Sequence, residues 1–295
     1  MSDYAHSESL VSTQWLEEHL NDANTRVIEI TWGSSPAFGR PAYEKEHVPG
    51  ALAWDFENDL KNNVNRDFPD KNNIEALLSK SGITAETGIV LYSGISNITA
   101  TYAFWLLKIY GHNDVRLLDG DREKWISEKR PCNRTLPTIA YTKYLAHDPD
   151  WSIRAGRNDV LRSINDPDCI LVDARSIDMY QGIDKSGAAR GGHIPGAINF
   201  PAVRETNVDS SFKAWNIMTV LPDRSFRAAS DLRKLFGTTG ISDHQEIIVY
   251  CVRGGLSTHA WFVMTQLLGY KHVREYDASW MEWGSLEGFP VEVSE

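Results

Sequence analysis

The sequence is poor in cysteine and has no pairing pattern for the few cysteines that it contains. Its 295 residues include only three, Cys132, Cys169 and Cys251, and none of them forms a CxxC pair. An odd and sparse set of this kind fits neither a disulfide framework nor a zinc site. We therefore expect a reducing compartment, in which a single reactive thiol becomes possible, and no metal centre.

Positive charge and long apolar runs are also scarce. The 40 acidic residues outnumber the 30 lysines and arginines, so the formal net charge is −10. This balance argues against a nucleic acid or an anionic membrane surface as the main partner. No apolar run approaches the ~20 residues of a membrane span, and the N-terminus lacks the basic and apolar stretches of a signal peptide. We expect a cytoplasmic protein with neither a nucleic-acid nor a membrane partner.

What the sequence does contain is an internal repeat. The motif HVPGA at residues 47–51 recurs as HIPGA at 193–197. Further on, the segment that begins at Gly88 aligns without a gap on the one that begins at Glu246, 158 positions later. Four landmarks coincide in that alignment: Tyr92 with Tyr250, Gly111 with Gly269, Asp119 with Asp277, and Trp125 with Trp283. The chain is also long for one core, so we predict a duplicated domain with halves at 10–130 and 160–290, joined by residues 131–159.

Each half alternates short apolar strands with helical patterns. In the second half, residues 169–175 (CILVDAR), 246–251 (EIIVYC) and 272–277 (HVREYD) are typical of strands buried in a parallel sheet. Between the last two, apolar residues recur at helical spacing from Ala260 to Leu268, and Gly269 is a natural end. This order predicts two α/β domains, each with a parallel sheet covered by helices.

The stretch YCVRGGLSTH, residues 250–259, is the strongest candidate for a site. Cys251 ends a predicted strand, and Gly254 and Gly255 let the next loop curl so that its N–H groups form an anion nest. These amides, the dipole of the following helix and Arg253 would favour a thiolate. The alternative is a buried structural cysteine. The equivalent of Cys251 in the first half is Ser93, which indicates an active half beside an inactive one.

Several motifs together resemble the tandem-domain rhodanese family, with bacterial thiosulfate sulfurtransferases the nearest likeness. They are the two HxPGA motifs, VDARS, the cysteine loop with its helix, YDASWMEWG, and the closing GSLEGFPVE. The resemblance implies two tandem rhodanese-like α/β domains, the C-terminal one catalytic, and neither a metal nor an organic cofactor. It implies a cysteine that takes sulfane sulfur from a small anionic donor, becomes a persulfide, and passes the sulfur to cyanide or a thiol.

Carried over position by position, the resemblance assigns Cys251 as the persulfide-forming residue. Arg175 matches a family arginine that contacts substrate or clamps a loop by an ion pair, and Trp32 matches a tryptophan that faces the pocket in some relatives or packs in the core. Arg253 would hold an anionic donor or face solvent. The loop that cradles the sulfur anion comprises Val252, Arg253, Gly254, Gly255 and Leu256.

The residues of this loop do not decide which sulfur donor the protein uses. Thiosulfate-using relatives carry further charges where this chain has Val252, Gly255 and Leu256, whereas mercaptopyruvate-using relatives have small neutral loops that Arg253 does not match. Thiosulfate and 3-mercaptopyruvate therefore both stay candidates, as does a non-catalytic sulfur carrier. A cysteine phosphatase would need C-x5-R and thus an arginine at position 257, which is Ser257.

Overall fold

The chain folds into two compact units in a computed structural model that describes residues 3–62, 68–209 and 212–294. The N-terminal domain comprises Glu8–Asp150 together with Pro222–Phe226. The C-terminal domain comprises Met1–Ser7, Trp151–Leu221 and Arg227–Glu295. Each half of the sequence thus gives one domain, and each domain also takes up a short segment from elsewhere in the chain. No helix in the described ranges is both long and apolar enough to cross a bilayer.

The N-terminal domain contains one five-stranded sheet in which every pairing is parallel, in the order β1-β5-β4-β2-β3. A 3-10 turn, η1 (Ser7–Ser9), precedes the first strand. The strands are β1 (Leu10–Val11), β2 (Thr25–Thr31), β3 (Leu52–Asp55), β4 (Gly88–Ser93) and β5 (Val115–Leu118). The helices are α1 (Thr13–Glu18), α2 (Arg40–Lys45), α3 (Lys71–Lys80), α4 (Ile98–Ile109) and α5 (Arg122–Ser127).

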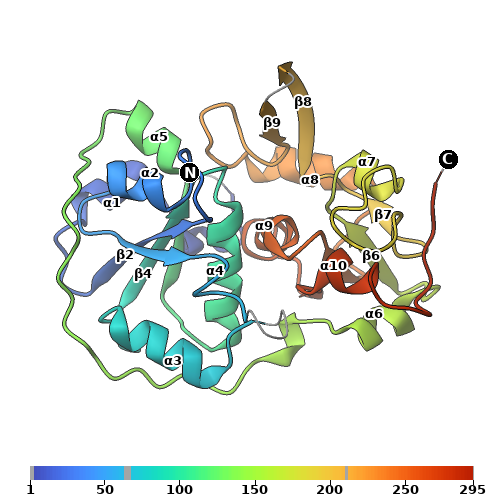
Figure 1. Cartoon of the computed structure of the whole chain (residues 1–295), viewed down its shortest axis with the longest axis horizontal. Helices are drawn as coiled ribbons and strands as arrows, with labels where there is room; N and C mark the ends of the chain where they lie inside the picture. Colours follow the sequence, from blue (N-terminus) through green and yellow to red (C-terminus); the bar gives the residue numbers. More distant parts are fainter. Residues whose placement is uncertain (1–2, 63–67, 210–211, 295) are drawn as a thin grey trace. The chain divides into compact units, whose positions relative to one another are not determined.

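Helices cover both faces of this sheet, as a parallel sheet requires. Side chains of α1, α2 and α5, among them Leu16, Tyr43 and Trp125, form one core cluster with the strand residues Val90 and Tyr92. Helices α3 and α4 lie on the other side of β2 and β4 (Figure 1). Every residue of α4 except Lys108 is buried, so this helix is buried on all sides rather than on one face only.

The C-terminal domain repeats the plan with a shorter parallel sheet, ordered β11-β10-β6-β7. Its strands are β6 (Cys169–Asp173), β7 (Ile198–Asn199), β10 (Glu246–Tyr250) and β11 (Val273–Glu275). An antiparallel hairpin of β8 (Val203–Asp209) and β9 (Phe212–Ile217) is inserted after β7. The helical elements are η2 (Trp151–Ile153), α6 (Arg157–Ser163), α7 (Ile177–Tyr180), α8 (Ala229–Gly237), α9 (Gly255–Phe262), the π-helical turn η3 (Val263–Leu267) and α10 (Ser279–Trp283).

Two tryptophans of α10 anchor one face of this second sheet. Trp280 and Trp283 have no exposed surface and pack with Ile248, Tyr250 and Tyr276 in one cluster. A fully buried aromatic side chain removes roughly 150–250 Å² from water, which is worth about 4–6 kcal/mol by area. The segment between β11 and α10 is thereby held firmly against the end of β10.

The structure confirms the duplication and the predicted parallel α/β sheets. Ile89 pairs with Val115 in the first sheet, and Ile247 pairs with Val273 in the second, so the 158-residue offset of the alignment is also the offset of the strand registers. The three predicted strands of the second half exist, each one to three residues shorter than its apolar run. The predicted helix ends before Gly269, whose φ of 78° is the left-handed value expected of a helix stop.

Candidate active site

Cys251 directly follows β10, at the edge of the sheet where the carboxyl ends of the parallel strands meet. Only 1% of it is exposed. Its backbone N–H donates to Ser279 Oγ at 3.0 Å, and its carbonyl accepts from the Trp280 N–H at 3.0 Å. Because both backbone groups are held by the start of α10, the position of the thiol is set by the buried tryptophan cluster.

The loop after Cys251 points a backbone donor at the sulfur. Gly254 has a φ of 91°, a left-handed value that a residue with a Cβ adopts at a cost. In this conformation the Gly254 N–H donates to Cys251 Sγ at 3.1 Å. Helix α9 begins at the next residue, Gly255, so its N-terminal dipole also lies beside the sulfur. Backbone groups thus contribute to stabilising negative charge on Sγ.

A serine and a glutamate complete the surroundings of the thiol. Ser257 Oγ lies 3.2 Å from Cys251 Sγ and 2.5 Å from Glu275 Oε1. Ser257 comes from the first turn of α9, and Glu275 is the last residue of β11. Neither residue has any exposed surface. A buried hydroxyl thus connects the sulfur to a buried carboxyl group.

The other loop residues named in the sequence analysis differ in exposure. Arg253 is exposed, Val252 and Leu256 are half-buried, and Gly254 is buried. The loop therefore directs its single cationic side chain outward, beside a backbone turned inward to the sulfur. The roles of these residues toward a substrate stay predictions.

Arg175 occupies a fully buried position with several partners. Its guanidinium forms an ion pair with Asp173 at 2.5 Å, donates to the Gly192 carbonyl at 2.7 Å, and stacks 4.3 Å from the Trp280 ring. Burial lowers the pKa of Arg175, but the nearby Asp173 carboxylate outweighs it and raises the pKa overall. This geometry matches the ion pair and loop clamp of the sequence analysis, and a substrate contact stays a prediction.

Trp32 belongs to the N-terminal domain, where it is half-buried just after β2. Its indole N–H donates to Glu57 Oε1 at 3.1 Å, and its ring lies 5.7 Å from Phe56 and 6.1 Å from Phe38. The indole is therefore ordered by polar and aromatic contacts within its own domain. Its predicted role in lining a pocket stays a prediction.

The remaining thiols and histidines fit structural roles. All three cysteines are free, and burial raises the pKa of both Cys132 and Cys169. His47 and His193 stack on Tyr43 and Tyr180, and each ring nitrogen Nδ1 contacts the carbonyl of the same tyrosine at 2.8 and 2.9 Å. These contacts fit a role of both HxPGA histidines in stabilising their turns.

His259 is fully buried, with Nε2 against the Thr219 hydroxyl at 2.7 Å. Burial lowers its pKa to about 4. The side chain is therefore neutral at physiological pH, and its buried contact with Thr219 fits a packing role.

The equivalent loop of the N-terminal domain has its amide groups occupied by the protein itself. Asn97 Oδ1 accepts from the Ser93 N–H at 2.7 Å, and Asp121 Oδ2 accepts from the Ser96 N–H at 2.9 Å. Ile95, Ser96 and Asn97 all have positive φ values, between 52° and 61°. Because the protein's own oxygens take the place of an anion, this loop differs from the Cys251 loop in more than its serine.

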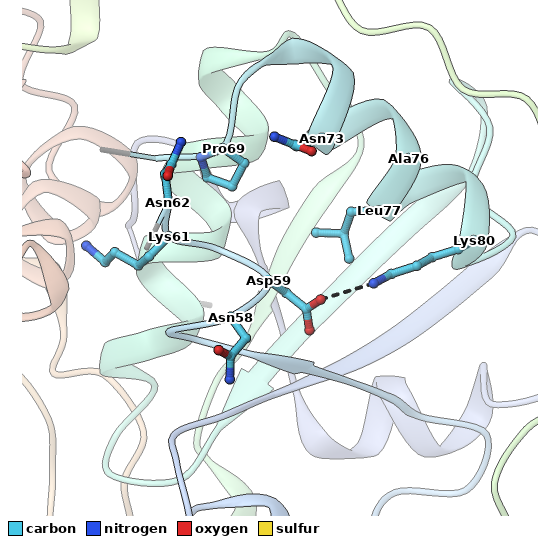
Figure 2. Close-up of a pocket in the computed structure, with 9 residues that line it drawn as sticks. All are labelled: Asn58, Asp59, Lys61, Asn62, Pro69, Asn73, Ala76, Leu77 and Lys80. Carbon is cyan, nitrogen blue, oxygen red and sulfur yellow. Dashed lines mark hydrogen bonds and ion pairs between the residues drawn. The ribbon is translucent and has the colours of Figure 1, made fainter. Parts of the chain in front are cut away.

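A separate cavity of about 350 Å³ lies in the N-terminal domain, between the end of β3 and helix α3 (Figure 2). Lys80 and Asp59 form an ion pair across it at 3.1 Å. The lining residues are mostly polar: Asn58, Asp59, Lys61, Asn62, Pro69, Asn73, Ala76, Leu77 and Lys80. They include no cysteine, histidine or serine, and the Lys80 and Asp59 side chains are paired with each other. Within the described ranges, no group of three or more His, Cys, Asp or Glu side chains could hold a metal ion.

Two residues of the site were not singled out from the sequence. Ser279 Oγ accepts a hydrogen bond from the Cys251 N–H, and the backbone of Ser279 has a positive φ of 55°. Glu275 contacts the Ser257 hydroxyl, which in turn contacts the sulfur. A signal for Glu275 did exist, because the alignment of the two halves places it on Leu117. An acid in one copy and an aliphatic residue in the other marks a position that the fold does not require to be charged.

Comparison with known proteins gives consistent matches over the whole chain. The rhodanese-like domain family matches twice, at residues 12–128 and 157–286. The chain is 40% identical over 302 residues to the sulfur carrier protein TtuD of Thermus thermophilus, an alignment that covers 99% of both proteins. It is 39% identical over 292 residues to the "Putative thiosulfate sulfurtransferase" of Saccharopolyspora erythraea, covering 97% of this chain and 96% of that protein.

Solved structures share the fold at lower identity. The crystal structure of YnjE superposes with a TM-score of 0.84 at 24% identity and covers 99% of this chain and 70% of that one. The anaerobic ergothioneine biosynthesis enzyme from Chlorobium limicola superposes with a TM-score of 0.86 at 22% identity, covering 100% and 72%. At such identities the likeness concerns the fold alone.

Proposed function

The chain belongs to the rhodanese family, and from this premise we propose that it is a sulfurtransferase whose reactive group is Cys251. The enzyme takes sulfane sulfur from a small anionic donor such as thiosulfate and holds it as a persulfide on Cys251. It then delivers the sulfur to cyanide or a thiol. Curated relatives that carry the name "Putative thiosulfate sulfurtransferase" at 37–39% identity support this assignment.

The observation that carries the proposal is the hydrogen-bonded seat of the Cys251 sulfur. Two donors approach Sγ, the Gly254 N–H at 3.1 Å and the Ser257 hydroxyl at 3.2 Å. Hydrogen bonds to an anionic acceptor are about twice as strong as those to a neutral one. These hydrogen bonds therefore stabilise the negative charge that develops on Sγ, both when the sulfur attacks the donor and when the acceptor later releases it.

The sulfur transfer itself is a pair of displacements. The Cys251 thiolate attacks the outer sulfur of thiosulfate, the S–S bond of the donor breaks, and sulfite leaves with the bonding electron pair. Cyanide or a thiolate then attacks the outer sulfur of the persulfide, and the electron pair of the Cys–S–S bond returns to Sγ. Splitting the transfer into two steps through a covalent intermediate is the usual advantage of a nucleophilic residue.

Two alternatives differ from the leading proposal in ways that one experiment can distinguish. A donor such as 3-mercaptopyruvate would use the same cysteine with pyruvate as the leaving group. A sulfur carrier would accept sulfur on Cys251 but pass it to a protein rather than turn over with small acceptors. The second alternative is supported by the 40% identity to the sulfur carrier protein TtuD.

The test is the change Cys251→Ser, with Cys169→Ser as the matched control. We expect Cys251→Ser to lower sulfur transfer by about 10³-fold or more, because removal of a covalent nucleophile removes the intermediate. Cys169→Ser should keep its rate, because Cys169 lies at the opposite end of β6 from the site. Steady-state kinetics with thiosulfate and with 3-mercaptopyruvate, together with circular dichroism, measure the activity, the donor and the retention of fold.

Intact-mass spectrometry of protein treated with donor alone completes the test. Wild type should gain one sulfur atom, and Cys251→Ser should not. A sulfur adduct without turnover by cyanide or small thiols would favour the carrier. Undiminished activity in a folded Cys251→Ser variant would refute the proposal.

A further inference from the structure

Three buried groups stand in a row at the end of β10. Cys251 Sγ, Ser257 Oγ and Glu275 Oε1 are separated by 3.2 Å and 2.5 Å, and each residue is at most 1% exposed. The row leads from the reactive sulfur into the interior of the C-terminal domain. Within this row, the carboxyl group of Glu275 is an acceptor inside the protein for a proton that leaves the sulfur.

Counting protons shows that the row can conduct one. The Ser257 hydroxyl carries a single proton and can donate to only one of its two neighbours at a time. The second contact therefore needs a proton on either the thiol or the carboxyl group. In one arrangement the thiol donates to Ser257, which donates to a Glu275 carboxylate. In the other, a protonated Glu275 donates to Ser257, which donates to the Cys251 thiolate.

Moving one proton along each bond converts the first arrangement into the second. The total charge stays at −1 in both, so the interior gains no additional charge when the thiolate forms. The Gly254 N–H adds a hydrogen bond that favours the arrangement with the charge on sulfur. The row thus provides an internal route by which the thiol can lose its proton and become a nucleophile.

The duplicated domain supplies an internal comparison for Glu275. Leu91 pairs with Leu117 in the N-terminal sheet as Val249 pairs with Glu275 in the C-terminal sheet, so Leu117 is the structural equivalent of Glu275. Leu117 is fully buried. The same position in the same fold is therefore filled well by an aliphatic side chain, whereas a buried carboxyl group costs free energy. At this position the domain with the cysteine has a carboxyl group, and the domain with Ser93 has none.

Charged groups on the neighbouring elements have other partners. The Arg154 guanidinium, whose backbone lies beside β11, pairs with Asp277 Oδ1 at 2.7 Å. On α9, the His259 ring lies against the Thr219 hydroxyl and has its pKa lowered to about 4 by burial. Asp173 at the end of β6 pairs with Arg175. The carboxyl group in line with the sulfur is that of Glu275.

We propose that Ser257 and Glu275 form a proton relay that activates Cys251, an inference that rests on the proposed sulfurtransferase function. As the sulfur donor binds, the thiol proton moves to Ser257 Oγ and the hydroxyl proton of Ser257 moves to Glu275 Oε1. The freed electron pair on Sγ forms the bond to the donor's outer sulfur, and sulfite leaves with the electrons of the broken bond. After the acceptor removes the sulfur, the proton returns along the same path. Ser257 touches the reacting atom, and Glu275 acts through it.

The test is Glu275→Gln, followed by the dependence of kcat/KM for thiosulfate on pH. The amide keeps the shape and can donate to Ser257 but cannot take up a proton, so the thiol must lose its proton to hydroxide. We expect kcat/KM to fall about 10²-fold near neutral pH, the low end of the range for general acid–base catalysis, and to rise with pH toward the wild-type value. A purely structural role would lower the rate by the same factor at every pH.

Matched variants distinguish loss of the proton relay from loss of the folded structure. Ser257→Ala should shift the pH profile as Glu275→Gln does, and Ser257→Thr should restore it, since Thr99 fills this position in the other copy. Glu275→Leu should lose activity while gaining thermal stability, because it reproduces the N-terminal domain. Glu287→Gln, which removes an exposed charge in the same domain, should leave the profile unchanged.

A second measurement keeps the relay separate from the sulfur chemistry. Iodoacetamide alkylates thiolates without any sulfur donor, and intact mass with Cys251→Ser as the blank assigns the adduct to Cys251. Wild type should reach a constant rate at a lower pH than Glu275→Gln. Coinciding profiles of these two proteins would overturn the relay alone. An unreactive Cys251 in wild type would overturn the proposed function as well.

Discussion

At the scale of single residues, two arginines near the site differ in what their surroundings allow. Arg175 is fully buried and shares its guanidinium among Asp173, Gly192 and Trp280, so its charge is already used within the domain. Arg253 is exposed on the cysteine loop and is the only charged residue between Cys251 and Ser257. Of the two, Arg253 is the better placed to attract an anion from solution, which matters in a protein with a net charge of −10.

We predict that Arg253→Ala raises the KM for thiosulfate about tenfold and changes kcat less, since an attraction made equally in ground and transition states affects binding. Arg253→Lys should give an intermediate KM, because it keeps the charge without the planar fork. Arg233→Ala, an exposed charge change on α8, is the control. Steady-state kinetics at two salt concentrations measure the effect, and an unchanged KM in Arg253→Ala would contradict this role.

At the scale of elements, the site depends on one turn between β10 and α9. Residues 252–254 reverse the chain within three positions, and the helix begins at once. Gly254 makes this possible with its φ of 91° and delivers the N–H that contacts the sulfur. Gly255, the first residue of α9, has no such requirement. The glycine pair thus divides into one position that demands glycine and one that does not.

Gly254→Ala should therefore destabilise the protein by about 1–2 kcal/mol, the cost of a left-handed conformation for a residue with a Cβ. It should also slow sulfur transfer, because relaxation of the strain turns the amide away from Sγ. Gly255→Ala should be neutral or stabilising by up to about 1 kcal/mol, since alanine is favoured within a helix. Urea unfolding of the two variants measures the difference, and equal midpoints would contradict the assignment.

The elements themselves could largely be predicted from the sequence, while their detailed ends could not. Apolar runs locate β6, β10 and β11 because buried parallel strands have no polar face. The continuous helix predicted after Cys251 turns out to be α9 followed by the π-helical turn η3. The hairpin of β8 and β9 was not predicted, because its sequence of residues 203–217 lacks a long apolar run.

At the scale of the whole molecule, two short segments belong to the domain that the other half of the sequence forms. One is residues 222–226, and the other is the segment at the N-terminus that precedes Glu8. Residues 222–226 pack on the N-terminal domain, where the Phe226 N–H donates to Asp119 at 2.8 Å and Asp223 pairs with Lys124 at 2.7 Å. The N-terminal residue Ala5 donates to the Leu267 carbonyl of the C-terminal domain at 3.0 Å. Contacts of this kind leave no periodic signal and were not predicted.

Stability of the whole protein should fall in mild acid because of His259. Burial lowers its pKa from the ordinary value near 6.5 to about 4, so the unfolded chain binds a proton that the folded chain refuses. The stability that His259 contributes is complete above pH 6.5 and is lost as the pH falls toward 4. A shift of this size corresponds to about 3 kcal/mol.

His259→Gln should remove this part of the pH dependence even if it lowers stability at neutral pH through weaker packing. His244→Gln is the control, because the His244 side chain is 88% exposed. The measurement is the free energy of unfolding in urea between pH 4 and pH 7.5. Parallel curves for wild type and His259→Gln would refute the assignment.

The sequence by itself determined the duplication, the parallel α/β class, the nucleophile candidate and the glycines of its loop. Each depends on residues close together in the chain or on a pattern present twice, so local reasoning reaches it. Only the tertiary structure decided that Ser257, from α9, contacts the Cys251 sulfur and that Glu275, from β11, contacts Ser257. The parallel register of β10 and β11 aligns Val249 with Glu275 and so sets the carboxyl group beside the strand end that bears the cysteine. The register between two strands is a property of the folded sheet, and it cannot be read from the spacing of residues along one strand.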